Sequence, residues 1–141
     1  MDIRRPAWRR MLLRALVRRR KHRRLVAAGL VACGLGGRLS IVGNRLMVNK
    51  GGVFGVLATM LGFEGAFMER ALRISQISAI EIDKPALFLR YMRITYPGAP
   101  HQSGNNLHDM MAENAILMSL FDNRPFYRVM ARIEALMDAD D

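Results

Sequence analysis

The feature that most constrains this chain is the uneven distribution of its charge. Of the 22 lysines and arginines in 141 residues, eleven lie in residues 1–24, where Asp2 is the only acid. The formal net charge of +10 belongs to that segment, because residues 25–141 contain equal numbers of bases and acids. A basic nucleic-acid-binding fold is therefore not indicated for residues 25–141. We expect a basic arm over residues 1–24, disordered or helical, followed by one domain over residues 25–141.

Residues 7–24 of the arm have the composition of a helix. They contain no glycine, are rich in arginine, leucine and alanine, and follow Pro6, which suits the first turn of a helix. An apolar stripe is predicted from residues that recur three and four positions apart: Trp8, Met11, Leu12, Ala15 and Leu16. The residues that we expect to bind a membrane or a polyanion are Trp8, Arg9, Arg10, Arg14, Arg18, Arg19, Arg20, Lys21, Arg23 and Arg24.

The arm has more than one candidate partner. A helix of this length is marginal in water, so we expect the arm to order on a partner. An anionic membrane surface is favoured, because each base near the headgroups contributes about 1 kcal/mol and an apolar stripe has a use there. A nucleic-acid backbone is the alternative, with the arm as an electrostatic tether. Two simpler interpretations stay open, a solvated arm and a translation start placed upstream of the native one.

The arm is followed by an apolar run, Leu25 to Leu35, that contains the only cysteine, Cys33. One cysteine excludes an intramolecular disulfide, and no Cys/His set has the spacing of a zinc site. The run is too short to cross a bilayer, which takes about 20 residues. The basic segment before Leu30-Val31-Ala32-Cys33 also resembles a lipoprotein signal with Cys33 as the lipidated residue. The apolar stretch is short for such a signal, and we expect Cys33 to be buried in a strand.

Short runs of alternating apolar and polar residues follow. They predict strands over residues 38–42, 45–49, 70–74, 77–82, 87–96 and 115–120. Gly43-Asn44 suits a tight hairpin turn between the first two. Because no connection is long enough for a helix that crosses between parallel strands, we expect an α+β, mainly β fold built on a small antiparallel barrel.

Two longer connections interrupt this pattern. Gly51 to Met68 is largely apolar and predicts a short helix or a lid over one mouth of the barrel, with membrane insertion or contact between identical chains as alternatives. Pro97 to Met110 is rich in turn residues and predicts a mobile surface loop. His101, His108 and Asp109 lie in that loop, but their spacing matches no metal-ligand set, so we expect no metal.

The chain ends in a predicted amphipathic helix. Asp122 or Asn123 can cap it, and Pro125 suits its first turn. Its apolar face is formed by Phe126, Val129, Met130, Ile133, Leu136 and Met137. Such a stripe packs on a core, and here we expect it to cover an open end of the sheet.

This order of elements is that of the pleckstrin-homology (PH) superfold. The sequence resembles bacterial PH-like domains of unknown function that often accompany short C-terminal (SHOCT) domains. The resemblance covers residues 31–137 and rests on segments 34–39, 44–48, 50–52, 72–80, 112–116 and 126–134. It implies a barrel of six or seven strands capped by the C-terminal helix, with Val31 to Cys33 in the first strand. The basic arm is not part of that family's pattern.

No catalytic constellation is present in the sequence. There is no Gly-x-Ser-x-Gly motif and no phosphate-binding loop, and the carboxylates of Glu64, Glu69, Glu81 and Asp83 lie in separate segments without a base partner. We expect no enzymatic activity and no cofactor. The predicted function is a bacterial cytoplasmic interaction domain that the arm recruits to the inner membrane face, where it binds a protein partner or a second copy. A nucleic-acid-associated protein is the alternative, and a lipoprotein anchored at Cys33 is less favoured.

Overall fold

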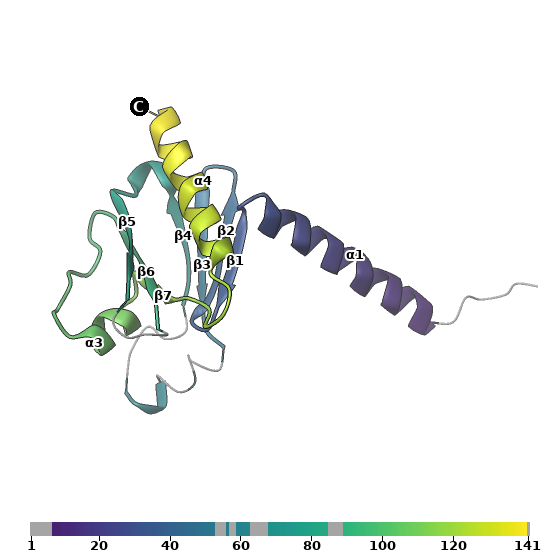
Figure 1. Ribbon diagram of the computed structural model, residues 1–141, viewed down its shortest axis with the longest axis horizontal. Coiled ribbons are helices and arrows are strands. Elements are labelled where there is room, and N and C mark those ends of the chain that lie inside the picture. The colour runs from purple at the N-terminus through teal and green to yellow at the C-terminus, as the bar shows by residue number, and fades with distance from the viewer. Residues whose placement is uncertain (1–6, 53–55, 57–58, 63–67, 85–88, 141) are drawn as a thin grey trace, which may run out of the picture.

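The computed structural model describes residues 7–52, 56, 59–62, 68–84 and 89–140. They form an α+β fold with two antiparallel sheets and a C-terminal helix (Figure 1). In chain order the elements are α1 (Ala7–Ala27), β1 (Val31–Gly34), β2 (Gly37–Val42), β3 (Arg45–Lys50), β4 (Met68–Arg73), the 3-10 turn η1 (Ile74–Gln76), β5 (Ala79–Asp83), β6 (Tyr91–Thr95), α3 (Asn106–Met111), β7 (Ala115–Leu117) and α4 (Arg124–Asp140).

The first sheet is a four-stranded meander in the order β1-β2-β3-β4. The hairpin predicted at Gly43-Asn44 is confirmed, because Val42 pairs with Arg45 on either side of the turn. Gly43 has φ +61, a value that L side chains rarely adopt and that glycine tolerates. β1 is the edge strand of this sheet, and it contains Val31 to Cys33, which the PH-like resemblance implied for the first strand.

The second sheet has three strands in the order β5-β6-β7. Its three strands are shorter than predicted, since β5 starts at Ala79, β6 starts at Tyr91 and β7 ends at Leu117 among the described residues. The expected closed barrel is not seen in the described residues, which form two separate sheets. The sheets meet where the backbone N–H of Gly36, in the β1–β2 turn, donates to the carbonyl of Leu117 at 3.1 Å.

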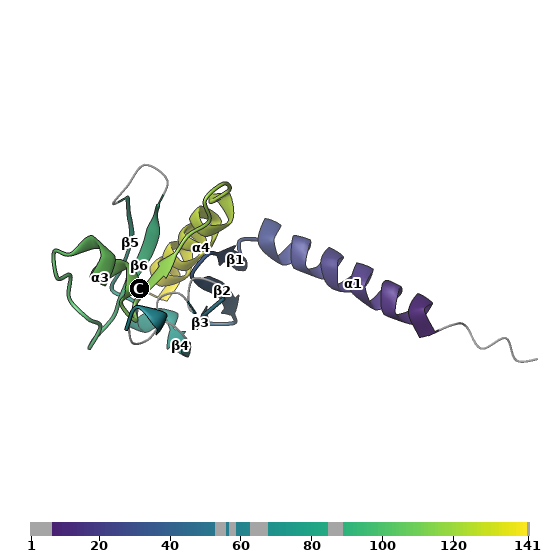
Figure 2. The same cartoon turned by 90° about the horizontal axis from the view of Figure 1, so that it is seen from below.

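The core lies between the two sheets and α4. Leu39 and Leu46 of the first sheet and Met92 and Ile116 of the second are fully buried in it. The predicted face of α4 is confirmed. Its fully buried residues are Phe126, Val129 and Ile133, and its partly buried residues are Met130, Leu136 and Met137. Because this stripe follows the helical period, α4 seals one side of the space between the sheets (Figures 1 and 2).

The segment predicted as a mobile loop contains helix α3. Its N-cap is Asn105, whose side-chain oxygen accepts hydrogen bonds from the backbone N–H of Leu107 at 3.1 Å and of His108 at 3.3 Å. Met110 and Met111 are buried in a second small cluster with residues of β6 and β7. The loop prediction was therefore wrong for residues 106–111, because six residues are too few to show a helical period.

The apolar connection after β3 is described only in part. Val56 and Met60 are helical and exposed, and Leu61 is exposed beside them. Met68, the last apolar residue of the predicted segment, begins β4 instead. The remaining apolar residues lie outside the described residues: Val53, Phe54, Leu57, Phe63 and Phe67.

Candidate functional site

The predicted arm forms helix α1, which projects away from the two sheets (Figures 1 and 2). Twenty-one residues at about 1.5 Å per residue make it about 30 Å long. None of its residues is buried, and the apolar side chains of its outer half are open to solvent, with Trp8 58%, Leu12 55% and Leu16 56% exposed. The helix is therefore confirmed. The guanidinium of Arg9 lies 5.6 Å from the centroid of the Trp8 ring, but no described residue of the sheets or of α4 buries the apolar side chains of the outer half.

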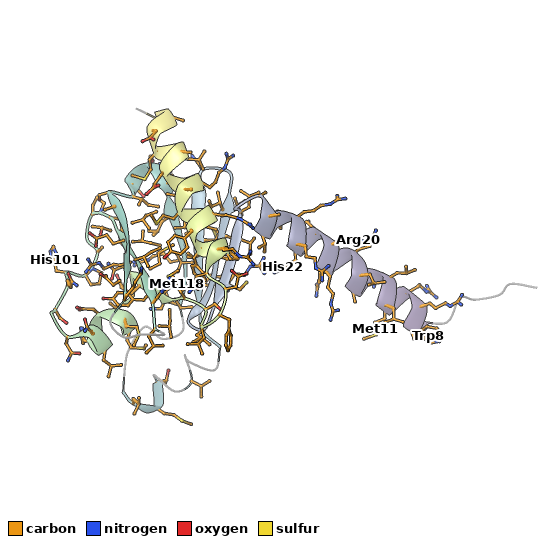
Figure 3. All side chains as sticks on the ribbon, viewed as in Figure 1. Trp8, Met11, Arg20, His22, His101 and Met118 are labelled. Atoms are coloured by element: carbon orange, nitrogen blue, oxygen red, sulfur yellow. The ribbon has the colours of Figure 1, made fainter. Side chains whose placement is uncertain are left out.

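The balance of apolar and basic side chains changes along the axis of α1, although Arg9, Arg10 and Arg14 accompany the apolar residues of the outer half. Residues 8–17 include seven apolar side chains, whereas residues 18–24 are all arginine, lysine or histidine. Figure 3 places Trp8 and Met11 near the outer end of the helix and His22 near the sheets. At about 100° per residue, Arg19 and Arg23 fall on the line that would continue the predicted stripe. The stripe therefore ends at Leu16, and the inner part of α1 is basic on all sides.

The positive charge of α1 is not compensated within the described residues. The ion pairs there join Arg70 to Glu113, Arg93 to Glu81 and Asp83, His108 to Asp109, and Arg124 to Asp122. The sequence contains no aspartate or glutamate between residues 3 and 63. Like charges four positions apart, such as Arg14 and Arg18, each destabilise a helix by about 0.2–0.5 kcal/mol. An anion that neutralises these bases would therefore stabilise α1.

A defined cap joins α1 to the domain. The backbone N–H of Leu30 donates to the carbonyl of Leu25 at 2.9 Å, and that of Gly29 donates to Val26 at 3.1 Å. This is the Schellman pattern, in which a left-handed residue ends the helix, and Gly29 has φ +70. The backbone of Gly29 also packs on α4, because a Cβ there would lie 2.9 Å from the carbonyl oxygen of Arg128. The direction of α1 is thus fixed by backbone contacts at its inner end.

A basic cleft of about 990 Å³ lies between α1 and the first sheet. Arg38, an exposed residue of β2, is the only member of its lining that comes from the sheet. The lining residues are Met11, Arg14, Ala15, Arg18, Arg19, His22, Arg23 and Arg38. Five of the eight are arginines and none is an acid. Of the predicted binding residues, four therefore face a shared space, while Arg9, Arg10, Arg20, Lys21 and Arg24 lie outside it together with Trp8.

Cys33 lies in β1, the element expected for it, but its side chain is exposed. The expected burial is therefore wrong. The register pairs Cys33 with Arg38 of β2, which places both on the outer face of the first sheet. Anchoring at Cys33 stays the less favoured alternative.

The described carboxylates from the sequence inspection have structural roles or lie apart. Glu81 forms an ion pair with Arg93, and Asp83 lies 4.0 Å from the same guanidinium. Glu69 is exposed on β4, and Glu64 lies outside the described residues. No group of three or more His, Cys, Asp or Glu among the described residues could hold a metal ion.

Two buried charged residues stabilise the fold around α3. The carboxylate of Asp109 accepts hydrogen bonds from the hydroxyl of Ser103 at 2.6 Å and from the backbone N–H of Ser103 at 2.7 Å. These hydrogen bonds hold the pKa of Asp109 below its usual value. The Nζ of Lys50 donates to the carbonyl of Ala112 at 2.6 Å. Burial lowers the pKa of Lys50 to about 8, and the nearby Glu113 partly opposes this shift. Sequence inspection missed both roles.

Comparisons of the chain with protein-family models, with curated proteins and with solved structures find no match. Within the part of the chain that the structure describes, no helix has the length and apolar character needed to span a bilayer.

Proposed function

We propose that this chain is a non-catalytic interaction domain that α1 holds at an anionic membrane surface, at the cytoplasmic face of a bacterial membrane. The observation that carries the proposal is the exposure of α1, which combines an apolar outer half with bases that have no ion-pair partner among the described residues. A bilayer interface offers both an apolar layer and negative charge within the width of one helix.

The apolar residues decide between a membrane and a nucleic acid. Trp8, Leu12 and Leu16 are each more than half exposed, and full burial of a large apolar side chain contributes about 1.5–3 kcal/mol. A phosphate backbone would bind the arginines but would leave this surface in water. Residues 18–24 do not distinguish the two partners, since seven consecutive basic or histidine side chains suit any polyanion.

A PH-like arrangement is proposed for the domain itself. Supporting it are the antiparallel meander of four strands, the three following strands and the final helix, which come in the order that the sequence resemblance implied. The lack of catalysis is supported by the ion pairs and hydrogen bonds that hold Glu81 and Asp109. The two sheets would then present a surface to a protein partner or to a second copy.

The test is co-flotation with vesicles of phosphatidylcholine, with and without phosphatidylglycerol, beside a salt-titrated shift assay on duplex DNA. The wild type is compared with a Leu12→Gln/Leu16→Gln variant and with an Arg20→Gln/Arg24→Gln variant. We expect flotation only with the anionic vesicles, a large loss in the leucine variant and a blue shift of the fluorescence of Trp8, the only tryptophan. Binding of DNA but not of vesicles, unaffected by the leucine substitutions, would favour the nucleic-acid alternative.

A further inference from the structure

We propose that the cleft between α1 and β2 binds the phosphate group of an anionic lipid, with Arg38 as the contribution of the folded domain. This inference rests on the proposed function and extends it, because it assigns the headgroup to one side of the arm and adds a residue outside the arm.

The first argument is the arrangement of the lining residues on α1. Arg14, Arg18 and His22 are spaced four positions apart and form one row along the helix. Arg19 and Arg23 lie in the adjacent row, beyond Met11 and Ala15. The cleft wall therefore changes along the helix axis, from Met11 and Ala15 beside Arg14 at the outer end to arginine and histidine alone at the inner end.

The second argument is the position of Arg38 opposite these rows. It is exposed on the outer face of β2, and its cross-strand neighbours on that face are Cys33 and Asn49. The next residue in this line is Glu69, two strands away, or about 10 Å at the usual strand spacing. No ion pair joins Arg38 to a carboxylate among the described residues. Its guanidinium is thus available to an external anion.

The third argument is the chemistry that satisfies such a cluster. Five arginines around one space repel each other, and an oxyanion placed between them reduces that repulsion. A guanidinium binds two phosphate oxygens in a bidentate manner, so guanidiniums on opposite walls can hold one phosphate between them.

The occupant is assigned as a lipid because the cleft continues into the apolar surface of the arm. Met11 and Ala15 belong both to the cleft lining and to the apolar stripe with Trp8 and Leu12. A lipid whose acyl chains pack under the stripe would present its phosphate to the basic inner end. A free phosphate would use only the inner half of the cleft.

The test uses two pairs of arginines that differ in position but not in charge. Arg18 and Arg38 line the cleft, whereas Arg20 lies on another side of α1 and Arg45 lies at the opposite end of the β2–β3 hairpin, outside the cleft lining. We compare Arg18→Ala, Arg38→Ala and their double variant with the matched Arg20→Ala, Arg45→Ala series. Affinity is measured for phosphatidylcholine vesicles with and without phosphatidylglycerol at fixed ionic strength.

Each cleft variant is expected to weaken binding to the anionic vesicles by about tenfold. Each control is expected to weaken it by about fivefold or less, which is the contribution of one base near a charged surface. The effects of Arg18→Ala and Arg38→Ala are expected to be non-additive, because both bind one phosphate. Inorganic phosphate is expected to compete only weakly with the anionic vesicles for the protein, relative to chloride at the same ionic strength. If the circular dichroism spectrum shows that Arg38→Ala alters the fold, Arg38→Lys replaces it in the comparison. That variant keeps the charge and loses the bidentate contact, and Arg45→Lys is its control.

Equal losses in the cleft and control series, with wild-type binding intact, would overturn the cleft while leaving the proposed function in place. Additive losses would likewise exclude a shared phosphate. Strong competition by inorganic phosphate would assign the cleft to a free anion and overturn the lipid as occupant. Absence of wild-type binding to anionic vesicles would overturn the proposed function and the lipid site together.

Discussion

The Nζ of Lys50 lies 2.6 Å from the carbonyl oxygen of Ala112, a residue 62 positions away in the chain. Lys50 ends β3 of the first sheet, and Ala112 follows α3, which packs on the second sheet. The ammonium thus satisfies a carbonyl at the C-terminal end of α3, where a positive charge is favourable. The contact joins the end of β3 to the segment between α3 and β7.

The first prediction follows from the lowered pKa of Lys50. The folded protein releases this proton near pH 8, whereas the unfolded chain keeps it to about pH 10.5. Between these values the unfolded state binds more protons, so raising the pH favours folding, by at most about 1.4 kcal/mol per pH unit. We expect the free energy of unfolding of the wild type to rise relative to Lys50→Met between about pH 8 and pH 10. Urea denaturation measures it.

Lys84→Met is the control for this experiment, because Lys84 is exposed on the surface after β5. Its stability is expected to run parallel to that of the wild type over the same pH range. A constant difference between wild type and Lys50→Met would show that burial does not shift the pKa of Lys50.

The second prediction concerns the buried face of α4. Truncating Phe126 or Ile133 to alanine removes fully buried side chains and is expected to cost about 2–5 kcal/mol, because a cavity remains. Arg128→Ala changes an exposed side chain on the same helix and is expected to stay within about 0.5 kcal/mol. Urea denaturation compares the three variants. Equal destabilisation by Arg128→Ala and Ile133→Ala would contradict the assigned face.

The third prediction tests the cap of α1. Gly29→Ala places a Cβ 2.9 Å from a backbone oxygen and also strains a left-handed residue. Gly43→Ala carries the same kind of strain, about 1–2 kcal/mol, but its Cβ would meet nothing within 4 Å. We expect Gly29→Ala to lower the free energy of unfolding by clearly more than Gly43→Ala. Similar losses would mean that Gly29 is needed for its φ alone.

The fourth prediction concerns removal of the arm. Deleting residues 1–24 is expected to leave the melting temperature nearly unchanged, because the described residues among them are all exposed. Binding to anionic vesicles is expected to be lost. Calorimetry and flotation on the same preparation measure both effects, and a fall of many degrees would show that α1 packs on the domain.

The elements that sequence inspection predicted well are those with a long period or a specific turn. α1 and α4 each repeat their apolar residues over several turns, and Gly43-Asn44 has the residue types of a tight hairpin. The sequence could not show that the strands form two sheets and not a closed barrel, because hydrogen bonds between distant segments, such as that of Gly36 to Leu117, leave no local pattern. α3 was missed because a single cap, Asn105, specifies it.

The arm residues of the candidate cleft were identified by composition but not by position. The bases of the arm were identified because they are concentrated in one segment, whereas Arg38 resembles any exposed base of a strand. Its place opposite Arg18 depends on where α1 stops and how it leaves the domain. Those properties are set by Gly29, through a contact with α4 that is about one hundred residues distant in the chain.

The cap at Gly29 also sets the rotational phase of α1. Because the helix is fixed at its inner end, the number of residues between Leu16 and Gly29 determines which side chains face β2. One inserted alanine would turn every side chain beyond it by about 100° around the axis without altering the charge of the helix or lowering its helix propensity. Met11 and Ala15 would then leave the cleft, and the apolar stripe would no longer adjoin Arg38. The number of residues between Leu16 and Gly29 therefore matters to the cleft as much as which residues they are.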